Sequence, residues 1–99
     1  MLPRDAAITL DAGTLCLQAT DALNYWEPPC LFTPLDFGLV GFSFACGLGV
    51  KTARPDRAVV SLMGDGGFGM TLSELSTAVD YGINTVSYTH LTLPTICSV

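Results

Sequence analysis

A glycine-rich loop that carries one carboxylate is the stretch of this sequence best suited to chemistry. Residues 64–70 read Gly-Asp-Gly-Gly-Phe-Gly-Met and follow the apolar run of residues 59–63. A β-branched apolar run that is broken by glycines and followed by a helical pattern predicts a strand, a tight turn and a helix. Glycines let a ligand approach the backbone, and the unpaired N–H groups and dipole at a helix start favour an anion. The loop therefore predicts a phosphate-binding site.

The carboxylate of Asp65 indicates that the predicted phosphate site also binds a metal ion. It stands between Gly64 and Gly66, where a bound phosphate would lie close to its carboxylate. Two like charges about 4 Å apart repel each other by roughly 4 kcal/mol at an intermediate dielectric. A cation between them removes this repulsion, so we expect Asp65 to be a ligand of a divalent metal.

The spacing of the glycines also matches the dinucleotide-binding fingerprint, as Gly64-x-Gly66-x-x-Gly69. That fingerprint expects an acidic residue about 20 positions later, which binds the ribose. No acidic residue follows Asp80. A non-catalytic nucleotide- or phosphate-binding module of Rossmann-like type stays open as an alternative, as does a plain glycine turn with an incidental aspartate.

A longer set of residues resembles one enzyme family. Its motifs are Gly64-Asp65-Gly66, Glu74-Leu75, Thr77-Ala78-Val79, Ile83-Asn84, Pro55-Asp56-Arg57 and the segment from Gly38 to Lys51. Together they resemble the diphosphate-binding domain of thiamine diphosphate enzymes, most closely the acetolactate synthase-like branch of 2-oxoacid decarboxylases and carboligases, which are lyases and transferases. The resemblance implies a three-layer α/β fold, a parallel sheet with helices on both faces. It also implies a parent enzyme that acts on a small-molecule 2-oxoacid.

The resemblance implies a role for each residue of the site. Asp65 would hold Mg²⁺, and the backbone of the loop glycines would hold the diphosphate of the cofactor. Two other turns would contact thiamine diphosphate, and a bulky residue in one of them, Val40, would bend it. The complete set of cofactor-binding residues is Gly13, Thr14, Val40, Gly41, Gly64, Asp65, Gly66 and Gly67. None of them is catalytic, since the catalytic glutamate of such enzymes lies in another domain of the partner subunit.

The sequence departs from this family at two positions near the site. Leu15 stands where many relatives have a histidine, and Val40 stands where acetolactate synthases often carry methionine. Two alternative interpretations stay open. Gly13 could be a simple turn residue, and Val40 could belong to a buried helix without any contact to a ligand.

Hydrophobic spacing predicts the elements that position the loop. Residues 6–10 are expected to form a strand, and residues 15–26 a helix that buries one face. That face consists of Cys16, Ala19, Leu23 and Trp26. A second helix is expected to pack closely through small residues spaced by four. These residues are Gly41, Ala45 and Gly49.

The turns and caps around these elements are also predictable. The charged turn that contains Lys51, Arg54 and Arg57 is expected to be a solvated rim. After the loop, Thr71 and Glu74 have the spacing of a capping box at the start of a helix. Gly82 is expected to end that helix.

Composition limits the partners of the chain. Nine acidic residues against four basic ones give a net charge of -5, which argues against nucleic acid and anionic membranes, because both need clustered Lys and Arg. The longest nearly apolar stretch, residues 37–50, is too short to span a bilayer, and no secretory signal is recognisable. Four cysteines without a CxxC pair indicate reduced thiols in a cytoplasmic protein. With 49% hydrophobic and only 13% charged residues, the chain is expected to be a piece of a larger protein. The resemblance implies that this larger protein is a homodimer or homotetramer.

Residues 85–99 differ in character from the rest of the chain. Residues 86–95 read Val-Ser-Tyr-Thr-His-Leu-Thr-Leu-Pro-Thr, which resembles the in-frame translation of a transposon-type sequencing adapter. We therefore divide the chain into residues 1–84, a fragment of the cofactor-binding domain, and residues 85–99, a non-native tail. In the resembling family a second metal ligand ends the next strand, and its place falls on Leu91 and Thr92, which cannot supply a carboxylate or amide. The fragment is expected to be inactive alone.

Overall fold

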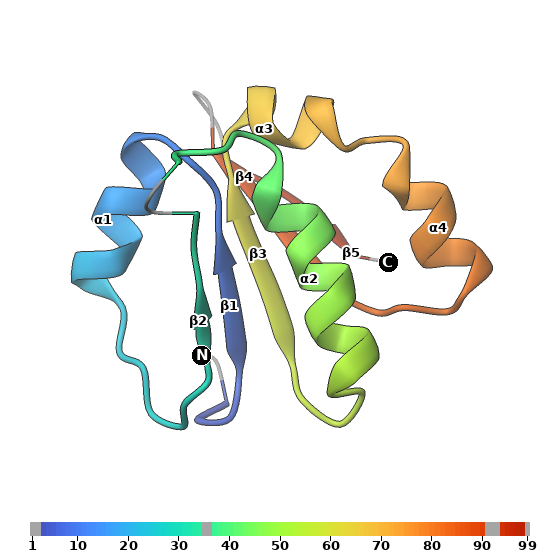
Figure 1. Ribbon diagram of the computed structural model, residues 1–99, viewed down its shortest axis with the longest axis horizontal. Helices are drawn as coiled ribbons and strands as arrows, with labels where there is room; N and C mark the ends of the chain where they lie inside the picture. The colour runs from blue at the N-terminus through green and yellow to red at the C-terminus, as the bar shows by residue number, and fades with distance from the viewer. Residues whose placement is uncertain (1–2, 35–36, 91–93, 99) are drawn as a thin grey trace.

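The computed structural model of the chain describes residues 3–34, 37–90 and 94–98, and it alternates strands with helices (Figure 1). The elements are β1 (Ala7–Leu10), α1 (Thr14–Ala22), β2 (Leu31–Phe32), α2 (Phe42–Ala53), β3 (Val59–Met63), α3 (Asp65–Met70), α4 (Glu74–Asp80), β4 (Val86–His90) and β5 (Pro94–Ser98). The expected site at Leu91 and Thr92 lies outside the described residues. Within the described ranges, no helix has both the length and the apolar character needed to cross a membrane.

The strands form one sheet in the order β2-β1-β3-β4-β5. The first four strands run parallel to one another, and β5 pairs antiparallel with β4. In the centre of the sheet Ile8 lies beside Val60, and Val60 lies beside Val86. Because parallel strands end at the same edge of a sheet, the loops after β1, β2 and β3 are brought together there.

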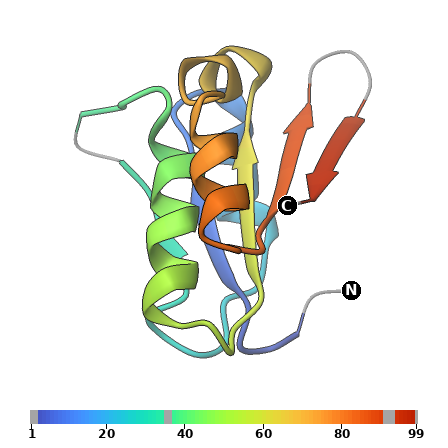
Figure 2. The ribbon, with the colours of Figure 1, turned by 90° about the vertical axis from the view of Figure 1, so that its right-hand side faces the viewer.

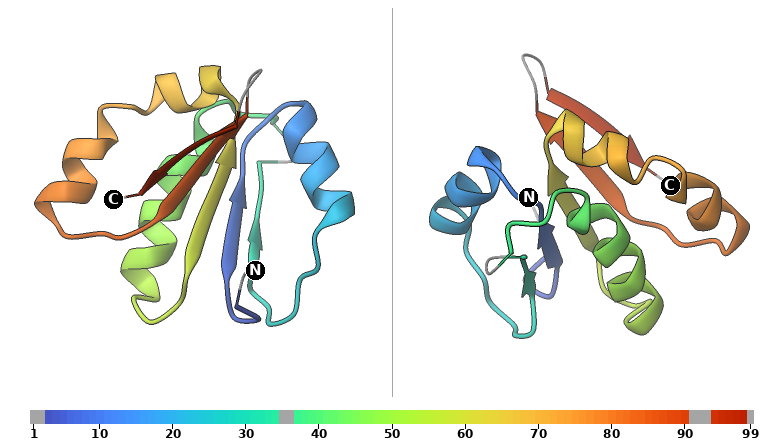
Figure 3. Two further views of the ribbon diagram at one scale, coloured as in Figure 1. Left: turned by 180° about the vertical axis from the view of Figure 1, so that it is seen from behind. Right: turned by 45° about the horizontal axis from the view of Figure 1, so that its top comes forward.

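Helices cover both faces of the sheet, which confirms the three-layer α/β fold. On one face Ile8 and Leu10 pack against Ala19 of α1. On the other face Met63 packs with Phe44 and Leu48 of α2 and with Ala78 of α4. Figure 2 shows α2 and α4 on the same side of β3, and the view from behind in Figure 3 shows α1 beside β1 and β2. The alternation of side chains along β1 and β3 explains the two apolar cores.

A buried group of hydroxyls, which we call the hydroxyl triad, joins β1, β3 and α2. Thr9 Oγ1 donates to Ser61 Oγ at 2.8 Å, Ser61 Oγ donates to the Ser43 carbonyl at 3.3 Å, and Ser43 Oγ donates to the Thr9 carbonyl at 2.8 Å. Each hydroxyl of the triad therefore has a partner inside the core.

The predicted small-residue face of α2 is wrong. Ala45 and Gly49 are exposed, and a Cβ on Gly49 would meet no atom within 4 Å. The close approach is made by Gly47 instead, where a Cβ would lie 2.2 Å from Ser61 Oγ. The helix is rotated because its large side chains Phe44 and Leu48 must enter the core, and Gly47 shares their face.

Two other sequence interpretations are corrected at the opposite end of the sheet. Arg57 is only 6% exposed, because its guanidinium donates to the carbonyl oxygens of Asp5, Glu27 and Pro29. Arg57 is thus a buried residue that joins three segments of the chain, rather than part of a solvated rim. The first helix ends at Ala22 rather than Trp26, and Trp26 is 55% exposed.

The chain after the glycine loop forms two short helices. The predicted capping box is absent, since α4 begins after Ser73 and has no side-chain cap, and Glu74 accepts a hydrogen bond from Thr77 instead. The end of α4 is as predicted. Gly82 has a φ of 62°, and the Ile83 N–H donates to the Ala78 carbonyl at 2.8 Å, which is the arrangement of a glycine-terminated helix.

Candidate functional site

Three turns meet at the carboxyl edge of the sheet and build the candidate site. One follows β1, one precedes α2 and one follows β3. Each leads directly into a helix whose N-cap residue is a glycine without a side-chain cap, namely Gly13, Gly41 and Gly64. The starts of α1 and α3 therefore offer backbone N–H groups, because the first N–H groups of a helix have no partner within it.

The glycine loop is open to a ligand. Asp65 and Gly66 are exposed, and a Cβ on Gly64 or Gly66 would meet no atom within 4 Å. The first helical hydrogen bond runs from the Phe68 N–H to the Gly64 carbonyl at 3.0 Å, so the N–H groups of residues 65–67 stand at the start of α3. The loop has the backbone donors and the free carboxylate that the sequence predicted.

Gly67 differs from its neighbours because it is buried. A Cβ at this position would lie 1.9 Å from Oδ2 of Asp11. Any side chain here would therefore collide with a carboxylate that comes from the end of β1. The packing of the protein itself requires glycine at this position.

Asp11 is the residue of the site that sequence reasoning missed. It is 2% exposed, and its carboxylate accepts hydrogen bonds from the Gly41 N–H at 2.9 Å and from the Ser43 N–H at 3.1 Å. The negative charge thus lies at the positive end of the α2 dipole, which stabilises it. The one available signal was an acidic residue directly after an apolar strand, at the sheet edge where parallel strands place their ligands.

The turn that contains Val40 and Gly41 rests on α3. Gly41 has a φ of 94°, and a Cβ there would lie 3.3 Å from the Met70 Cβ. Val40 precedes α2 and is 43% exposed, which rules out its interpretation as a buried helical residue. The structure therefore brings Val40 and Gly41 next to the glycine loop, with the Gly41 N–H already bound to Asp11.

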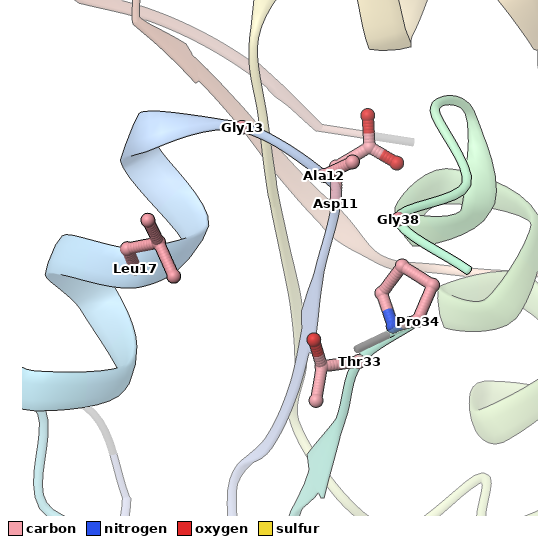
Figure 4. A pocket seen from close by; sticks show the side chains of 7 residues that line it. All are labelled: Asp11, Ala12, Gly13, Leu17, Thr33, Pro34 and Gly38. Atoms are coloured by element: carbon pink, nitrogen blue, oxygen red, sulfur yellow. The ribbon is translucent and has the colours of Figure 1, made fainter. Parts of the chain in front are cut away.

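Gly13 and Thr14 lie at the start of α1, and both are exposed. Gly13 has a φ of 117°, so the backbone conformation itself favours glycine here. Beside it is a pocket of about 180 Å³, shown in Figure 4, between α1, the end of β2 and the turn at Gly38. Its lining residues are Asp11, Ala12, Gly13, Leu17, Thr33, Pro34 and Gly38.

Acidic and other metal-binding side chains are sparse around the loop. Among the residues that the structure describes, no three His, Cys, Asp or Glu side chains gather into a possible metal site. Asp65 is exposed, whereas the buried Asp11 is committed to the amides of α2. The loop thus presents a single free carboxylate.

Comparison with known proteins identifies relatives of this arrangement. The family model described as "Thiamine pyrophosphate enzyme, C-terminal TPP binding domain" matches residues 11–89. The chain is 51% identical over 81 residues to the acetolactate synthase large subunit of Haemophilus influenzae, covering 82% of this chain and 14% of that protein. It is 34% identical over 82 residues to the sulfoacetaldehyde acetyltransferase of Alcaligenes xylosoxydans xylosoxydans, covering 83% of this chain and 14% of that protein. It is also 37% identical over 87 residues to a probable acetolactate synthase of Mycobacterium bovis, covering 88% of this chain and 16% of that protein.

Proposed function

Because this chain belongs to the family of C-terminal thiamine pyrophosphate-binding domains, we propose that it binds thiamine diphosphate and Mg²⁺ at the carboxyl edge of its sheet. The observation that carries the proposal is the open loop after β3, where an exposed carboxylate stands among accessible backbone N–H groups. Asp65 would hold Mg²⁺, and Gly64, Gly66 and Gly67 would hold the diphosphate. Gly13 and Thr14 would contact the same group from α1.

We propose that the parent protein is a 2-oxoacid decarboxylase or carboligase of the acetolactate synthase-like kind. The names of its relatives, acetolactate synthase and sulfoacetaldehyde acetyltransferase, support this substrate class. Thiamine diphosphate supplies a nucleophilic carbon and an electron sink when bound. The residues of this chain would bind and orient it, and Val40, beside the loop, would press on it. No residue of the chain is assigned a catalytic role.

We propose that Mg²⁺ binds weakly to the chain as it stands. Mg²⁺ prefers about six oxygen ligands in octahedral geometry, and Asp65 is the one free carboxylate that the described part of the loop offers. Water and diphosphate would have to supply the other oxygens. The missing ligand would come from the native continuation after residue 84, in place of the tail at residues 85–99.

Calorimetry on the full-length source protein tests the site. Thiamine diphosphate should bind only with Mg²⁺, and Asp65→Asn should weaken binding strongly while the melting temperature changes little, because the carboxylate is exposed. Asp56→Asn, an exposed aspartate in the turn before β3, is the matched control and should bind normally. Metal-independent binding of NAD would favour the Rossmann-like phosphate-binding alternative and overturn the proposal.

Replacement of the tail tests the missing ligand. The full-length source protein would be compared with a version that carries the present residues 85–99 in place of its own continuation. The version with the present tail should bind thiamine diphosphate and Mg²⁺ far less tightly. Equal affinity would contradict both the non-native tail and the argument from the missing ligand.

We further propose that the parent is a homodimer or homotetramer in the cytoplasm. Large apolar side chains are exposed in the turn before α2 and at the end of α3, among them Phe37, Leu39, Met70 and Leu72, and large apolar patches on a surface usually mark a contact. Cys30 and Cys46 are free thiols, and burial raises the pKa of Cys46, which suits a reducing compartment. The isolated chain should therefore associate in light scattering, and a monodisperse monomer would contradict the proposal.

A further inference from the structure

The buried carboxylate of Asp11 links two parts of the site that come from distant stretches of the chain. On one side it accepts the Gly41 and Ser43 N–H groups at the start of α2. On the other side its Oδ2 faces Gly67 of α3 so closely that even a methyl group at residue 67 would collide with it. The turn before α2 and the loop after β3 therefore meet on one side chain.

We propose that Asp11 is a positioning residue that holds the Val40–Gly41 turn and the glycine loop as one unit. The proposal rests on the proposed function, because it assigns the unit to the binding of thiamine diphosphate. The space beside Gly41 supports it, since a Cβ on Gly41 would lie 3.3 Å from the Met70 Cβ and 3.4 Å from the Thr71 Cγ2. Asp11 itself would not touch the cofactor.

Asp11 also removes the start of α2 from the places that can receive an anion. Its carboxylate occupies the N–H groups of Gly41 and Ser43, so the start of α2 already carries its negative charge. The N–H groups at the start of α3 stay open. A diphosphate is thereby kept away from the turn that carries Val40.

The test uses Asp11→Asn in the full-length source protein, because asparagine keeps the shape of the side chain and removes the charge. Amide hydrogen exchange at Gly41 and Ser43 should become about tenfold to a hundredfold faster, because the neutral amide oxygen accepts these hydrogen bonds more weakly than the carboxylate does. The Ile8 N–H, which donates to the Cys30 carbonyl at 2.7 Å, reports on the sheet and should be unchanged. Asp56→Asn is the control for the loss of one charge.

Coupling between the two parts is measured with Mg²⁺ and inorganic diphosphate as the probe, since it lacks the rings that would reach Val40. In the unaltered protein this probe should slow exchange at Gly41 and Ser43, and in Asp11→Asn it should not. The dissociation constant for thiamine diphosphate with Mg²⁺ should also rise. Unchanged exchange in Asp11→Asn, or faster exchange with unchanged affinity for the cofactor, would overturn the proposal.

A second variant approaches the same unit from α3. Gly67→Ala should displace the Asp11 carboxylate and reproduce the faster exchange at Gly41 and Ser43, whereas Gly69→Ala, where a Cβ meets no atom within 4 Å, should not. If the unaltered protein binds no thiamine diphosphate, the proposed function fails. The exchange rates in Asp11→Asn and Gly67→Ala then show independently whether Asp11 connects the turn before α2 to the glycine loop. Unchanged exchange in both variants would show that it does not.

Discussion

Two regions on the same face of the sheet differ in the hydrogen bonding of their buried hydroxyls. In the region of β1 and β3, the hydroxyl triad of Thr9, Ser43 and Ser61 is fully hydrogen-bonded. In the region of β4, Ser87 lies beside Ser61 in the parallel register, yet its Oγ and that of Thr85 are buried without a hydrogen-bond partner among the described residues. A buried hydroxyl without a partner costs about 1–3 kcal/mol. The buried hydroxyls of the first region have hydrogen-bond partners in β1, β3 and α2, and those of the second region have none in the part of the chain that the structure describes.

This difference bears on the proposed origin of the two regions. Thr85 and Ser87 are the first buried hydroxyls of the segment that we assign to a non-native tail, whereas the triad belongs to residues 1–84. Native cores pair nearly all of their buried polar groups, although Thr71 Oγ1, within residues 1–84, is also buried without a hydrogen-bond partner in the described ranges. Unpaired hydroxyls are therefore expected where a segment was not selected together with the core that it contacts. Substitutions on the two sides of the β3–β4 pair can test this.

The largest effect is expected for Gly47→Ala on the matched side. The new methyl group would lie 2.2 Å from Ser61 Oγ, so α2 must shift and the triad must open. We expect a loss of about 2–3 kcal/mol in the free energy of unfolding, as for other overpacked cores. Urea denaturation of the chain at low protein concentration measures it.

Gly49→Ala is the matched control on the same helix. Its methyl group meets no atom within 4 Å, so the helix should gain about 0.5–1 kcal/mol from the loss of a glycine. Equal effects of the two substitutions would show that Gly47 makes no close approach to β3. Close packing of α2 on β3 would then no longer distinguish the two regions.

A smaller effect is expected for Thr9→Val, which keeps the shape of the side chain and removes its hydroxyl. Ser61 Oγ would lose its donor, and the free energy of unfolding should fall by about 1–2 kcal/mol. Thr85→Val is the matched change on the other side and should leave stability unchanged or increase it. A similar loss in both variants would contradict the difference between the regions.

The fold and the open loop could be predicted because their signals are local. The apolar run of β3, the glycines after it and the carboxylate of Asp65 stand within one short stretch, and propensity and turn chemistry act over such distances. The glycine that ends α4 was predicted for the same reason. The assignment of cofactor contacts to Gly13, Thr14, Val40, Gly41, Gly64, Asp65, Gly66 and Gly67 stays a prediction.

The errors occurred where contacts between distant segments decide the outcome. Arg57 is buried because the carbonyl groups of Asp5, Glu27 and Pro29 converge on it, and no local pattern reports that convergence. Asp11 was missed because its partners are 30 and 32 positions away. The close-packing glycine of α2 was misplaced because spacing by four does not tell which face a helix buries. Such features follow from tertiary packing, which overrides local preference.

The smallest and most direct test compares Ser61→Ala with Ser87→Ala, the same substitution at neighbouring positions of β3 and β4. Ser61→Ala removes one of the two acceptors of the Thr9 hydroxyl, the other being the Ser43 carbonyl, and should lower the free energy of unfolding by about 1 kcal/mol. Ser87 is 1% exposed, and alanine there removes a buried hydroxyl without creating a clash, so stability should rise by up to about 1 kcal/mol. The sign of the change, rather than its size, decides the comparison. If Ser87→Ala destabilises the chain as much as Ser61→Ala does, the Ser87 hydroxyl has a partner after all, and β4 fits this core as well as β3 does.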